Sequence, residues 1–212
     1  MKHSTLEKQF QKIIIALKIV DIKANSKQID LWFKHLSLLQ KYNKIYNLTA
    51  ITDIDQMLTK HLLDSLVISK FITRNSIIDI GTGAGFPGIP LAILTPEKSY
   101  VLIDSIAKKI RFVDYVKNTL KLNNIKSINT RVENYQPVMK FDHVVSRALS
   151  SIQKFYNFGY PLLKETGSFL VMKGNKTEEN KLQNLPVNHR IFKLKVPFLE
   201  AKRHLILMNP NK

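Results

Sequence analysis

The stretch Ile77-Ile-Asp-Ile-Gly-Thr-Gly-Ala-Gly-Phe-Pro-Gly-Ile-Pro90 decides the fold of this chain. It opens with a short, mostly β-branched run, Ile77 to Ile80, which predicts a buried strand. Glycines follow at alternate positions, beginning at Gly81, and they allow a tight turn and a close approach of a ligand to the backbone. A helix is predicted to start near Gly88, because proline is tolerated in the entry and first turn of a helix. Strand, glycine turn and helix together predict the cofactor corner of a doubly wound α/β sheet.

Asp79 indicates which cofactor this corner takes. The segment Gly83 to Gly88 matches the G-x-G-x-x-G spacing of dinucleotide sites, whose backbone amides face a pyrophosphate. A carboxylate two residues before the first glycine is a poor neighbour for a diphosphate, and it suits a ligand with a cationic end and ribose hydroxyls. The pattern Asp-x-Gly-x-Gly-x-Gly resembles the first motif of class I S-adenosylmethionine-dependent methyltransferases.

Composition sets limits on the partners. With 212 residues, of which 44% are hydrophobic, the chain has enough apolar side chains for one large domain, or for one domain with an extension. The net charge of +17 favours a polyanionic partner such as nucleic acid or an anionic membrane surface. There is no cysteine, which excludes disulfides, thiolate zinc sites and cysteine nucleophiles, and we expect no metal. No apolar run approaches the roughly 20 residues of a membrane span, and we expect a cytoplasmic protein.

The first third of the chain predicts helices. Apolar periodicity indicates one helix over about 4–20 and a second capped by Ser26, with Trp32 on its core-facing stripe. Residues 42–49 are predicted to form a loop, and a third helix is predicted from Asp53 or Asp55 to near Phe71. From residue 75 onward strands and helices alternate, which argues for a parallel sheet. We therefore expect a helical extension, 1–73, packed on a Rossmann-like core, 74–212, as a single structural unit.

The core is predicted to be a mainly parallel sheet with a C-terminal antiparallel hairpin. Glu165-Thr166-Gly167 is interpreted as a turn and 174–184 as a mobile loop or weak helix. The expected strands after the first cover 100–104, 125–130, 141–146 and 168–172, the expected helices cover 106–122 and 152–163, and the closing pair covers 189–196 and 204–208.

Three groups of residues follow successive strands of this predicted sheet. Asp104 ends the second strand, where a carboxylate reaches the ribose hydroxyls of an adenosine-bearing cofactor. Val132 and Glu133 follow the third strand, where their backbone amides would meet the adenine edge. Arg147, after the fourth strand, brings a cation to the mouth of the same crevice.

Several longer motifs carry a closer resemblance. They are Tyr46-Asn-Leu-Thr49, Lys60-His-Leu-Leu-Asp-Ser-Leu66, Asp79 to Ala92, Asp104-Ser105 with Lys108-Lys109, Phe141-Asp142 with Ser146-Arg-Ala148, and Met172-Lys-Gly174. Because it contains these motifs in this order, the chain resembles the bacterial 16S ribosomal RNA guanine-N7 methyltransferases, also called the glucose-inhibited division protein B family. The match covers nearly the whole chain, and the Gly-Phe-Pro-Gly-Ile-Pro extension is much more specific than a generic glycine motif. One departure is Lys60, where the family more often has arginine, so that a bidentate phosphate grip is lost.

The resemblance implies S-adenosylmethionine as cofactor and a guanine in the decoding-region loop of 16S RNA, in the small ribosomal subunit, as target. The expected cofactor-binding residues are Asp79, Gly81, Thr82, Gly83, Gly85, Phe86, Asp104, Ser105, Val132, Glu133 and Arg147. The expected RNA-binding residues are Lys60, His61, Lys108, Lys109, Arg111, Arg131, Lys173, Lys202 and Arg203. We expect the protein to act as a monomer.

The residues themselves agree with N7 as the acceptor. Methylation of a pyrimidine carbon usually needs a cysteine nucleophile, and methylation of an exocyclic amine is commonly served by an Asn/Asp-Pro-Pro-aromatic motif, which the segment after Ser146 lacks. Guanine N7 has an in-plane lone pair and no proton, so that its methylation needs alignment and exclusion of water but no general base. Arg147 is then a positioning residue for a substrate phosphate, guanine O6 or the cofactor carboxylate. His61 is interpreted as a packed or hydrogen-bonded helix histidine in preference to a catalytic base.

Two other functions remain open at this level. A nicotinamide-dependent oxidoreductase would use the same kind of sheet, but Asp79 and the lack of a convincing proton donor count against it. A basic RNA-binding or assembly protein without catalysis would explain the charge. The complete glycine motif and Asp104 argue against that loss.

Overall fold

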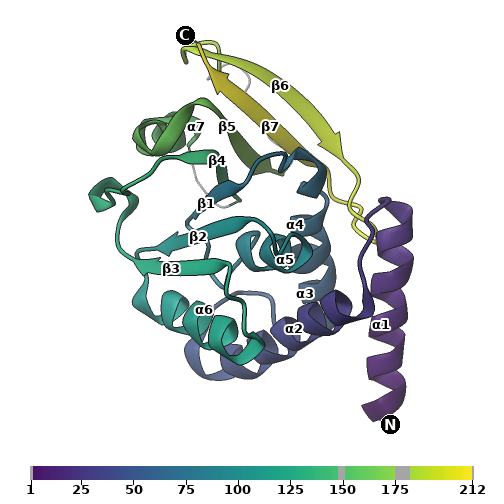
Figure 1. Cartoon of the computed structure of the whole chain (residues 1–212). Coiled ribbons are helices and arrows are strands. Elements are labelled where there is room, and N and C mark those ends of the chain that lie inside the picture. Colours follow the sequence, from purple (N-terminus) through teal and green to yellow (C-terminus); the bar gives the residue numbers. More distant parts are fainter. Residues whose placement is uncertain (1, 148–150, 175–181, 212) are drawn as a thin grey trace.

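A seven-stranded sheet forms the centre of the computed structural model, which describes residues 2–147, 151–174 and 182–211 (Figure 1). The strand order is β3-β2-β1-β4-β5-β7-β6. The strands are β1 (Ser76–Ile80), β2 (Ser99–Asp104), β3 (Ile125–Asn129), β4 (Phe141–Ser146), β5 (Leu163–Lys173), β6 (Val187–Leu194) and β7 (Arg203–Pro210). The first five pair in parallel and β7 pairs antiparallel with β5 and β6. The predicted α/β class with a C-terminal antiparallel hairpin is confirmed.

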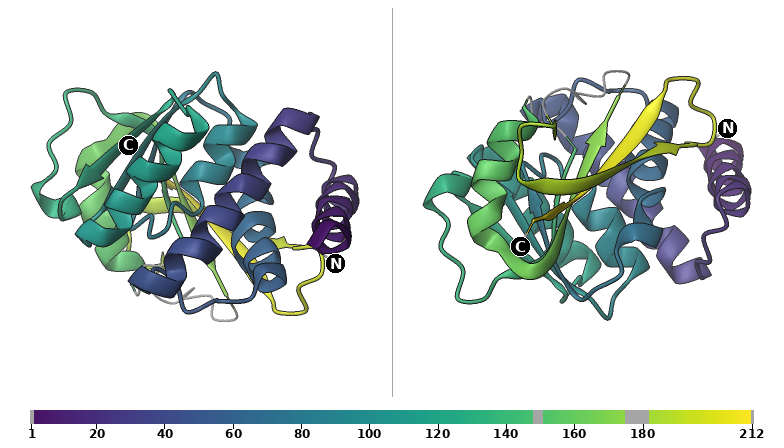
Figure 2. Two further views of the ribbon diagram at one scale, coloured as in Figure 1. Left: turned by 90° about the horizontal axis from the view of Figure 1, so that it is seen from below. Right: turned by 90° about the horizontal axis from the view of Figure 1, so that it is seen from above.

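Helices cover both faces of the sheet, because successive side chains of a strand point to opposite faces. Ile77 packs with α2 (Ser26–Tyr46), α5 (Gly88–Leu94) and α6 (Ala107–Leu120), whereas Ile78 packs with α7 (Ile152–Gly159). Seen from below, α2 and α6 lie side by side under the sheet (Figure 2, left). The core is therefore two clusters, one on each face.

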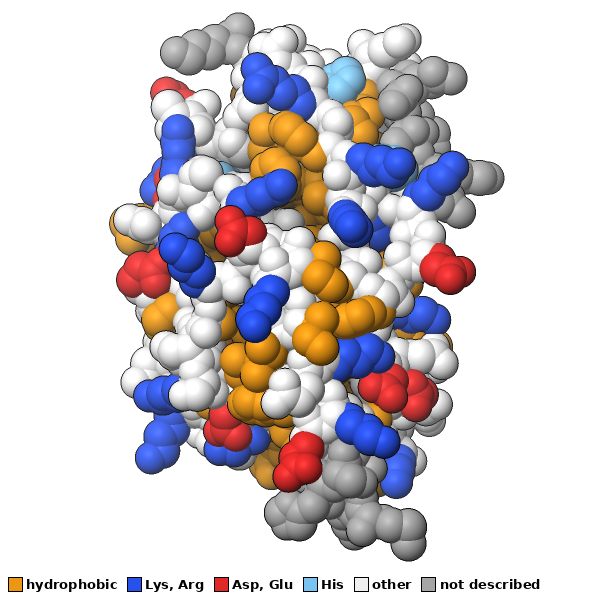
Figure 3. Space-filling model, turned by 90° about the vertical axis from the view of Figure 1, so that its right-hand side faces the viewer, with side chains coloured by type: hydrophobic (Ala, Val, Ile, Leu, Met, Phe, Trp, Pro, Cys, Tyr) orange, Lys and Arg blue, Asp and Glu red, His pale blue; other side chains and the backbone are white. Residues whose placement is uncertain are grey.

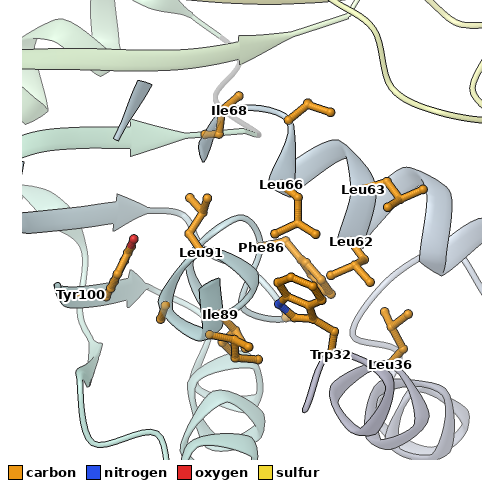
Figure 4. Packing of buried hydrophobic residues seen from close by; sticks show 14 of the residues in the cluster. Trp32, Leu36, Leu62, Leu63, Leu66, Ile68, Phe86, Ile89, Leu91 and Tyr100 are labelled. Carbon is orange, nitrogen blue, oxygen red and sulfur yellow. The ribbon is translucent and has the colours of Figure 1, made fainter. Parts of the chain in front are cut away.

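The residues before β1 form a set of helices against the first cluster. They are α1 (Lys2–Ile19), α2, α3 (Ile54–Met57), the π-helical segment η1 (Leu58–Leu63), α4 (Asp64–Leu66) and the 3₁₀ turn η2 (Ser69–Phe71). Trp32 of α2 is fully buried beside Phe86 and Ile89 (Figure 4), and its Nε1 donates to the Pro90 carbonyl at 3.0 Å. Trp32 is a core residue, as the apolar stripe predicted.

Three local predictions need correction. Asn25, one residue before Ser26, caps α2, because its side chain accepts from the Gln28 amide while the Gln28 side chain accepts from the Asn25 amide. The predicted loop over 42–49 is helical as far as Tyr46, and the helix ends at Asn47, which has a φ of 46°. Tyr42 packs against Phe112 of α6 with ring centroids 5.9 Å apart, and this tertiary contact supports the extra turn.

The predicted turn at 165–167 lies inside β5. Pairing with β4 jumps there from Phe141↔Leu163 to His143↔Ser168, so that these residues form an irregularity in a longer strand. Of the segment predicted as a loop or weak helix, 174–184, only Gly174 and 182–184 are among the described residues. The other predicted elements are present with ends shifted by a few residues.

The glycine turn after β1 has the backbone that its composition predicts. Gly81, Gly83 and Gly85 have φ values of 71°, 61° and 90°, and the Phe86–Pro87 peptide bond is cis. A Cβ on Gly88 would lie 2.0 Å from a methyl group of Leu102, so that α5 can start this close to β2 only with glycine.

Helix α1 lies at the edge of the molecule and faces the viewer in Figure 3. Apolar side chains form a stripe on this face, with lysine and arginine on both sides of it. Ile15 and Ile19 of α1 and Phe198 of the β6–β7 connection are exposed, and Phe198 has a φ of 62°.

Candidate active site

Asp79 organises the glycine turn. Its Oδ2 accepts hydrogen bonds from the Thr82 hydroxyl at 2.7 Å and from the Gly88 amide at 2.9 Å. Burial raises the pKa of this carboxyl to about 6, although both hydrogen bonds act in the opposite direction. Oδ1 is buried without a hydrogen-bond partner in the described structure. The carboxylate therefore joins the two ends of the turn and keeps one unsatisfied oxygen inside it.

A pocket of about 260 Å³ opens at the carboxyl ends of β1, β2 and β3. In open α/β sheets this edge is where ligands bind. Its walls are Ile80, Gly81, Ile103, Asp104, Ser105, Thr130, Arg131, Val132, Glu133 and Phe158. A Cβ on Gly81 would meet no atom within 4 Å, so that the backbone here borders open space.

Asp104 ties this pocket to the glycine turn. Its Oδ2 accepts from the Gly83 amide and its Oδ1 from the Ile106 amide, both at 2.9 Å, and Lys109 Nζ lies 3.9 Å away. Asn129 of β3 donates to the Asp104 carbonyl at 2.9 Å. The carboxylate thus holds the turn against β2 while it lines the pocket.

The pocket walls fit the adenosine part of a cofactor. Ile80, Ile103 and Phe158 provide apolar surface for a purine ring, and the Asp104 carboxylate provides an acceptor for ribose hydroxyls. Val132 and Glu133 begin the 3₁₀ turn η3 (Val132–Asn134), and the first N–H groups of a helical turn have no acceptor within that turn.

A second pocket, of about 300 Å³, opens at the ends of the neighbouring strands β4, β5 and β7. Its walls are Lys60, His61, Asp64, Arg147, Met172, Lys173, Gly174 and Arg203. The two pockets are close, because β1 and β4 are paired and the Ser146 hydroxyl donates to the Ile80 carbonyl at 2.8 Å. One contains a carboxylate and apolar walls, and the other is strongly basic.

Arg147 is held from several sides in the second pocket. Its guanidinium donates to the Lys60 carbonyl at 3.0 Å and to His61 Nδ1 at 3.2 Å, and lies over the Phe86 ring at 5.3 Å. Asp64 Oδ2 is 3.9 Å away, and Asp64 Oδ1 accepts from Arg203 Nε at 3.0 Å. Burial raises the pKa of Asp64, while Arg147 and Arg203 act against that rise. Two guanidinium groups share one buried carboxylate, which leaves the pocket net positive.

His61 is a buried, neutral ring in this network. Its Nε2 lies 2.9 Å from the Thr49 hydroxyl, and its ring stacks on Phe86 with centroids 4.8 Å apart. Burial and, secondarily, the charge of Arg147 lower the pKa of His61 to about 3. It belongs to η1, and π-helical turns within α-helices are frequent at functional sites. Both ring nitrogens are engaged, which agrees with the packed, hydrogen-bonded helix histidine that the sequence predicted.

The structure groups the predicted site residues in three places. The first pocket contains Gly81, Asp104, Ser105, Val132 and Glu133, together with Arg131, which was predicted to contact RNA. The second contains Arg147 with Lys60, His61, Lys173 and Arg203. The third place is the glycine turn, which lines neither pocket and contains Asp79, Thr82, Gly83, Gly85 and Phe86. The remaining predicted residues lie outside both pockets: Lys108, Lys109 and Arg111 are on α6, and Lys202 precedes β7.

Some lining residues were missed by the sequence analysis. Phe158 comes from α7, and its sequence carries no signal because its role depends on how α7 packs on the sheet. Asp64 had a signal, since it is a lone acid one helical turn after Lys60 and His61 in an otherwise apolar segment. The other residues missed in the two pockets are Ile80, Ile103, Thr130, Met172 and Gly174.

Residues 2–147, 151–174 and 182–211 contain neither a metal-binding cluster nor a membrane-spanning helix. No group of three or more histidine, aspartate or glutamate side chains there is arranged to hold a metal ion. No helix in those ranges combines the length and the apolar character needed to cross a membrane.

Comparison with known proteins shows one family. The family described as rRNA small subunit methyltransferase G matches residues 28–206. Ribosomal RNA small subunit methyltransferase G of Francisella tularensis subsp. novicida (strain U112) is 50% identical over 197 residues, which cover 93% of this chain and 95% of that protein.

Solved structures support the fold alone. A DhpI–SAH complex has a TM-score of 0.57 at 10% identity over 84% of this chain and 95% of that one. M. jannaschii TYW2 in complex with AdoMet has a TM-score of 0.53 at 16% identity, over 68% of this chain and 74% of that one. The glycine spacing left a methyltransferase and an oxidoreductase open, and the sequence match favours the methyltransferase. The chain belongs to the rRNA small subunit methyltransferase G family.

Proposed function

We propose that this protein transfers a methyl group from S-adenosylmethionine to N7 of a guanine in the decoding-region loop of 16S ribosomal RNA. The observation that carries the proposal is the pair of adjoining pockets, one suited to adenosine and one lined by Arg147, Arg203 and lysines. A methyl donor and a polyanionic acceptor need such neighbouring sites, because the reacting atoms must come within about 3–3.5 Å of each other.

The first pocket would hold the cofactor. In this proposal Asp104 and Ser105 would contact the ribose, Val132 and Glu133 would contact the adenine edge, and Gly81 would allow a close approach of backbone to ligand. Their shared position in the lining of one pocket supports it. Asp79, Thr82, Gly83, Gly85 and Phe86 would act through the shape of the turn. When bound, S-adenosylmethionine supplies a methyl group made electrophilic by its sulfonium.

The acceptor chemistry needs no proton transfer. Guanine N7 presents a lone pair in the ring plane, so that the residues have to align the base and exclude water. His61 is unsuited to act as a general base, because its pKa is lowered to about 3 and both ring nitrogens are engaged. This agrees with a reaction that needs no base. The chain has no cysteine for a covalent route.

Arg147 would position the acceptor. It lines the second pocket and not the first, which favours guanine O6 or an RNA phosphate over the cofactor carboxylate as its partner. Its guanidinium is oriented by the Lys60 carbonyl and His61. It should avoid N7 itself, because the product base gains positive charge there.

The remaining predicted RNA contacts would form the approach to this pocket. Lys60, Lys173 and Arg203 line it, while Lys108, Lys109 and Arg111 lie on α6 and Lys202 lies beside Arg203. Arg131 lines the first pocket.

We further propose that residues 1–73 are a helical extension forming one unit with the core, 74–212, and that the protein acts as a cytoplasmic monomer.

The test uses the purified protein, S-adenosylmethionine and 30S subunits from a strain that lacks this methylation. Cleavage at N7-methylated guanine maps the product, and a single new cleavage site in the decoding-region loop is expected. Subunits and deproteinised 16S RNA are compared as substrates. Unchanged guanine in both would favour a binding protein without catalysis.

A further inference from the structure

Three tyrosines form a patch where α2 and α6 meet, away from both pockets of the active site. Tyr42 and Tyr46 of α2 stack with centroids 6.0 Å apart, and Tyr42 contacts Tyr115 of α6 at 4.7 Å. Tyr46 is 46% exposed and Tyr115 is 39% exposed, whereas Tyr42 is anchored on Phe112. Two of the three rings are therefore partly exposed to solvent, and the third, Tyr42, packs on a buried phenylalanine.

A polar pocket of about 290 Å³ lies at the same C-terminal end of α2, on the side of the helix that faces residues 49–52. Its lining includes Gln40, Lys44, Asn47 and Thr52. All four side chains can donate hydrogen bonds, and all except the lysine can also accept them. We call the tyrosine patch and this pocket together the α2–α6 surface. Amide side chains can hydrogen-bond the edges of unpaired nucleobases, and exposed aromatic rings can stack on their faces.

The charge of the α2–α6 surface suits a polyanion. Lys41 and Lys44 of α2 are exposed, as is Arg111 of α6, and the sequence from 31 to 52 contains no acidic residue. The acid within α6, Asp114, accepts a hydrogen bond from Ser127. The acid that follows, Asp53, caps α3 by accepting from the Gln56 amide.

The α2–α6 surface is connected to the active site through Thr49. Thr49 lines the polar pocket, and its hydroxyl lies 2.9 Å from His61 Nε2. His61 in turn accepts from Arg147. A residue that lines the polar pocket is thus in direct contact with a residue that lines the second pocket.

We infer that the α2–α6 surface binds an unpaired segment of the substrate RNA next to the target guanine, with Tyr46 as a stacking platform and the polar pocket as the site for an adjacent nucleotide. This inference rests on the proposed function and extends it. RNA is favoured over a ribosomal protein as the occupant, because the exposed groups are cations, amides and ring faces in place of an aliphatic groove.

The experiment compares Tyr46→Ala, Tyr46→Phe and Tyr160→Ala. Tyr160 is the matched control, because it is 50% exposed at the end of α7 on the other face of the sheet. Binding of a labelled single-stranded RNA oligonucleotide with the sequence of the target loop is measured by fluorescence anisotropy. Methyl transfer to deproteinised 16S RNA and to 30S subunits gives KM and kcat, and S-adenosylhomocysteine binding verifies the cofactor site.

Tyr46→Ala should weaken oligonucleotide binding and raise KM about tenfold, which is the effect of losing one base–aromatic stack, with kcat and S-adenosylhomocysteine binding unchanged. Tyr46→Phe keeps the ring and should stay within about twofold of the parent protein. Unchanged oligonucleotide affinity in Tyr46→Ala, or an equal loss in Tyr160→Ala, would overturn the inference. A loss confined to 30S subunits would identify a protein as the occupant and overturn it too. Absence of methyl transfer by the parent protein would defeat the proposed function alone, because oligonucleotide binding still decides this inference.

Discussion

The guanidinium of Arg147 donates to Nδ1 of His61 across 3.2 Å, and this contact determines the protonation of the histidine. A guanidinium can only donate, so Nδ1 must accept and the single proton of the neutral ring lies on Nε2. Nε2 then donates to the Thr49 hydroxyl at 2.9 Å. Thr49 also accepts from the Ile51 amide, which anchors the chain of contacts to the backbone. His61 thus connects the loop that contains Thr49 to the arginine of the second pocket.

Replacing His61 by alanine should lower kcat by about tenfold through loss of arginine positioning, with cofactor binding unchanged. Steady-state methyl transfer and S-adenosylhomocysteine calorimetry measure the two quantities. If His61 acts through Arg147, adding His61→Ala to Arg147→Ala should produce no further loss. Additive losses in the double variant would mean that His61 contacts the substrate directly.

Arg147→Ala should lower methyl transfer by about 100-fold or more while the protein stays folded, because an oriented donor in a buried site is lost. Arg203 still pairs with Asp64 at 3.0 Å, which keeps that buried carboxylate partnered. Arg147→Lys retains the charge without the planar fork and should remain clearly impaired. Circular dichroism and thermal melting verify folding, and near-normal turnover of Arg147→Ala would remove this residue from the site.

Gly88→Ala should destabilise the protein by about 1–3 kcal/mol, because the added methyl would overlap Leu102 and crowd Asp79 Oδ2. A Cβ on Gly174 would only approach an Arg203 nitrogen, at 3.8 Å. Gly174→Ala is therefore the matched control and should change the free energy of unfolding by less than about 0.5 kcal/mol. Urea titration measures both, and equal effects would contradict the close approach of α5 to β2.

Stability should fall as the pH is lowered below neutrality. Burial lowers the pKa of His35 and that of His143 to about 4, and the pKa of His61 to about 3, from an ordinary value of 6.5. Below that ordinary value the unfolded chain binds protons that the folded chain does not, which removes about 2 kcal/mol of stability per histidine by about pH 5. The raised pKa of Asp79, about 6, acts in the opposite direction by roughly 1.4 kcal/mol, so the histidines dominate.

Urea titrations over this pH range measure the effect. Replacing His61 by glutamine should flatten the dependence, whereas replacing the exposed His189 of β6 by glutamine serves as the matched substitution. A stability that does not change with pH in this range would mean that the three buried histidines accept protons in the folded state.

Lys60→Ala should weaken binding of 16S RNA and lower the slope of log affinity against log salt by roughly one, as expected for one lost phosphate contact. The Lys60 side chain donates to Gln56 at 2.9 Å on the rim of the second pocket. Filter binding at several salt concentrations gives the slope. Lys34→Ala, on the first half of α2 where Lys34 pairs with Asp30, is the control and should leave the slope unchanged.

Much of the fold was predictable because its signals are local. The run Ile77 to Ile80 followed by alternate glycines predicted β1 and its turn, and the alternation after residue 75 predicted the parallel sheet. The errors came where local signals compete. Asn25 and Ser26 are both good caps, and the choice fell to the residue that could exchange hydrogen bonds with Gln28.

The candidate site was predictable in outline for the same reason. Residues that follow parallel strands meet at one edge, which is why Asp104, Val132 and Arg147 came together there. Phe158 could not be predicted, because the residues near it in the sequence do not indicate which pocket α7 will cover.

By itself, the sequence determined the sheet, the cofactor corner and the absence of cysteine chemistry, because strand periodicity, glycine spacing and composition are properties of neighbours along the chain. Only the tertiary structure decided that Asp79 turns inward to hold the glycine loop and that Phe86 lies beneath His61 and Arg147. It also decided that Tyr46 and Tyr115 share one surface. These relations depend on which faces of distant segments pack together, and that choice is made by the burial of the whole core.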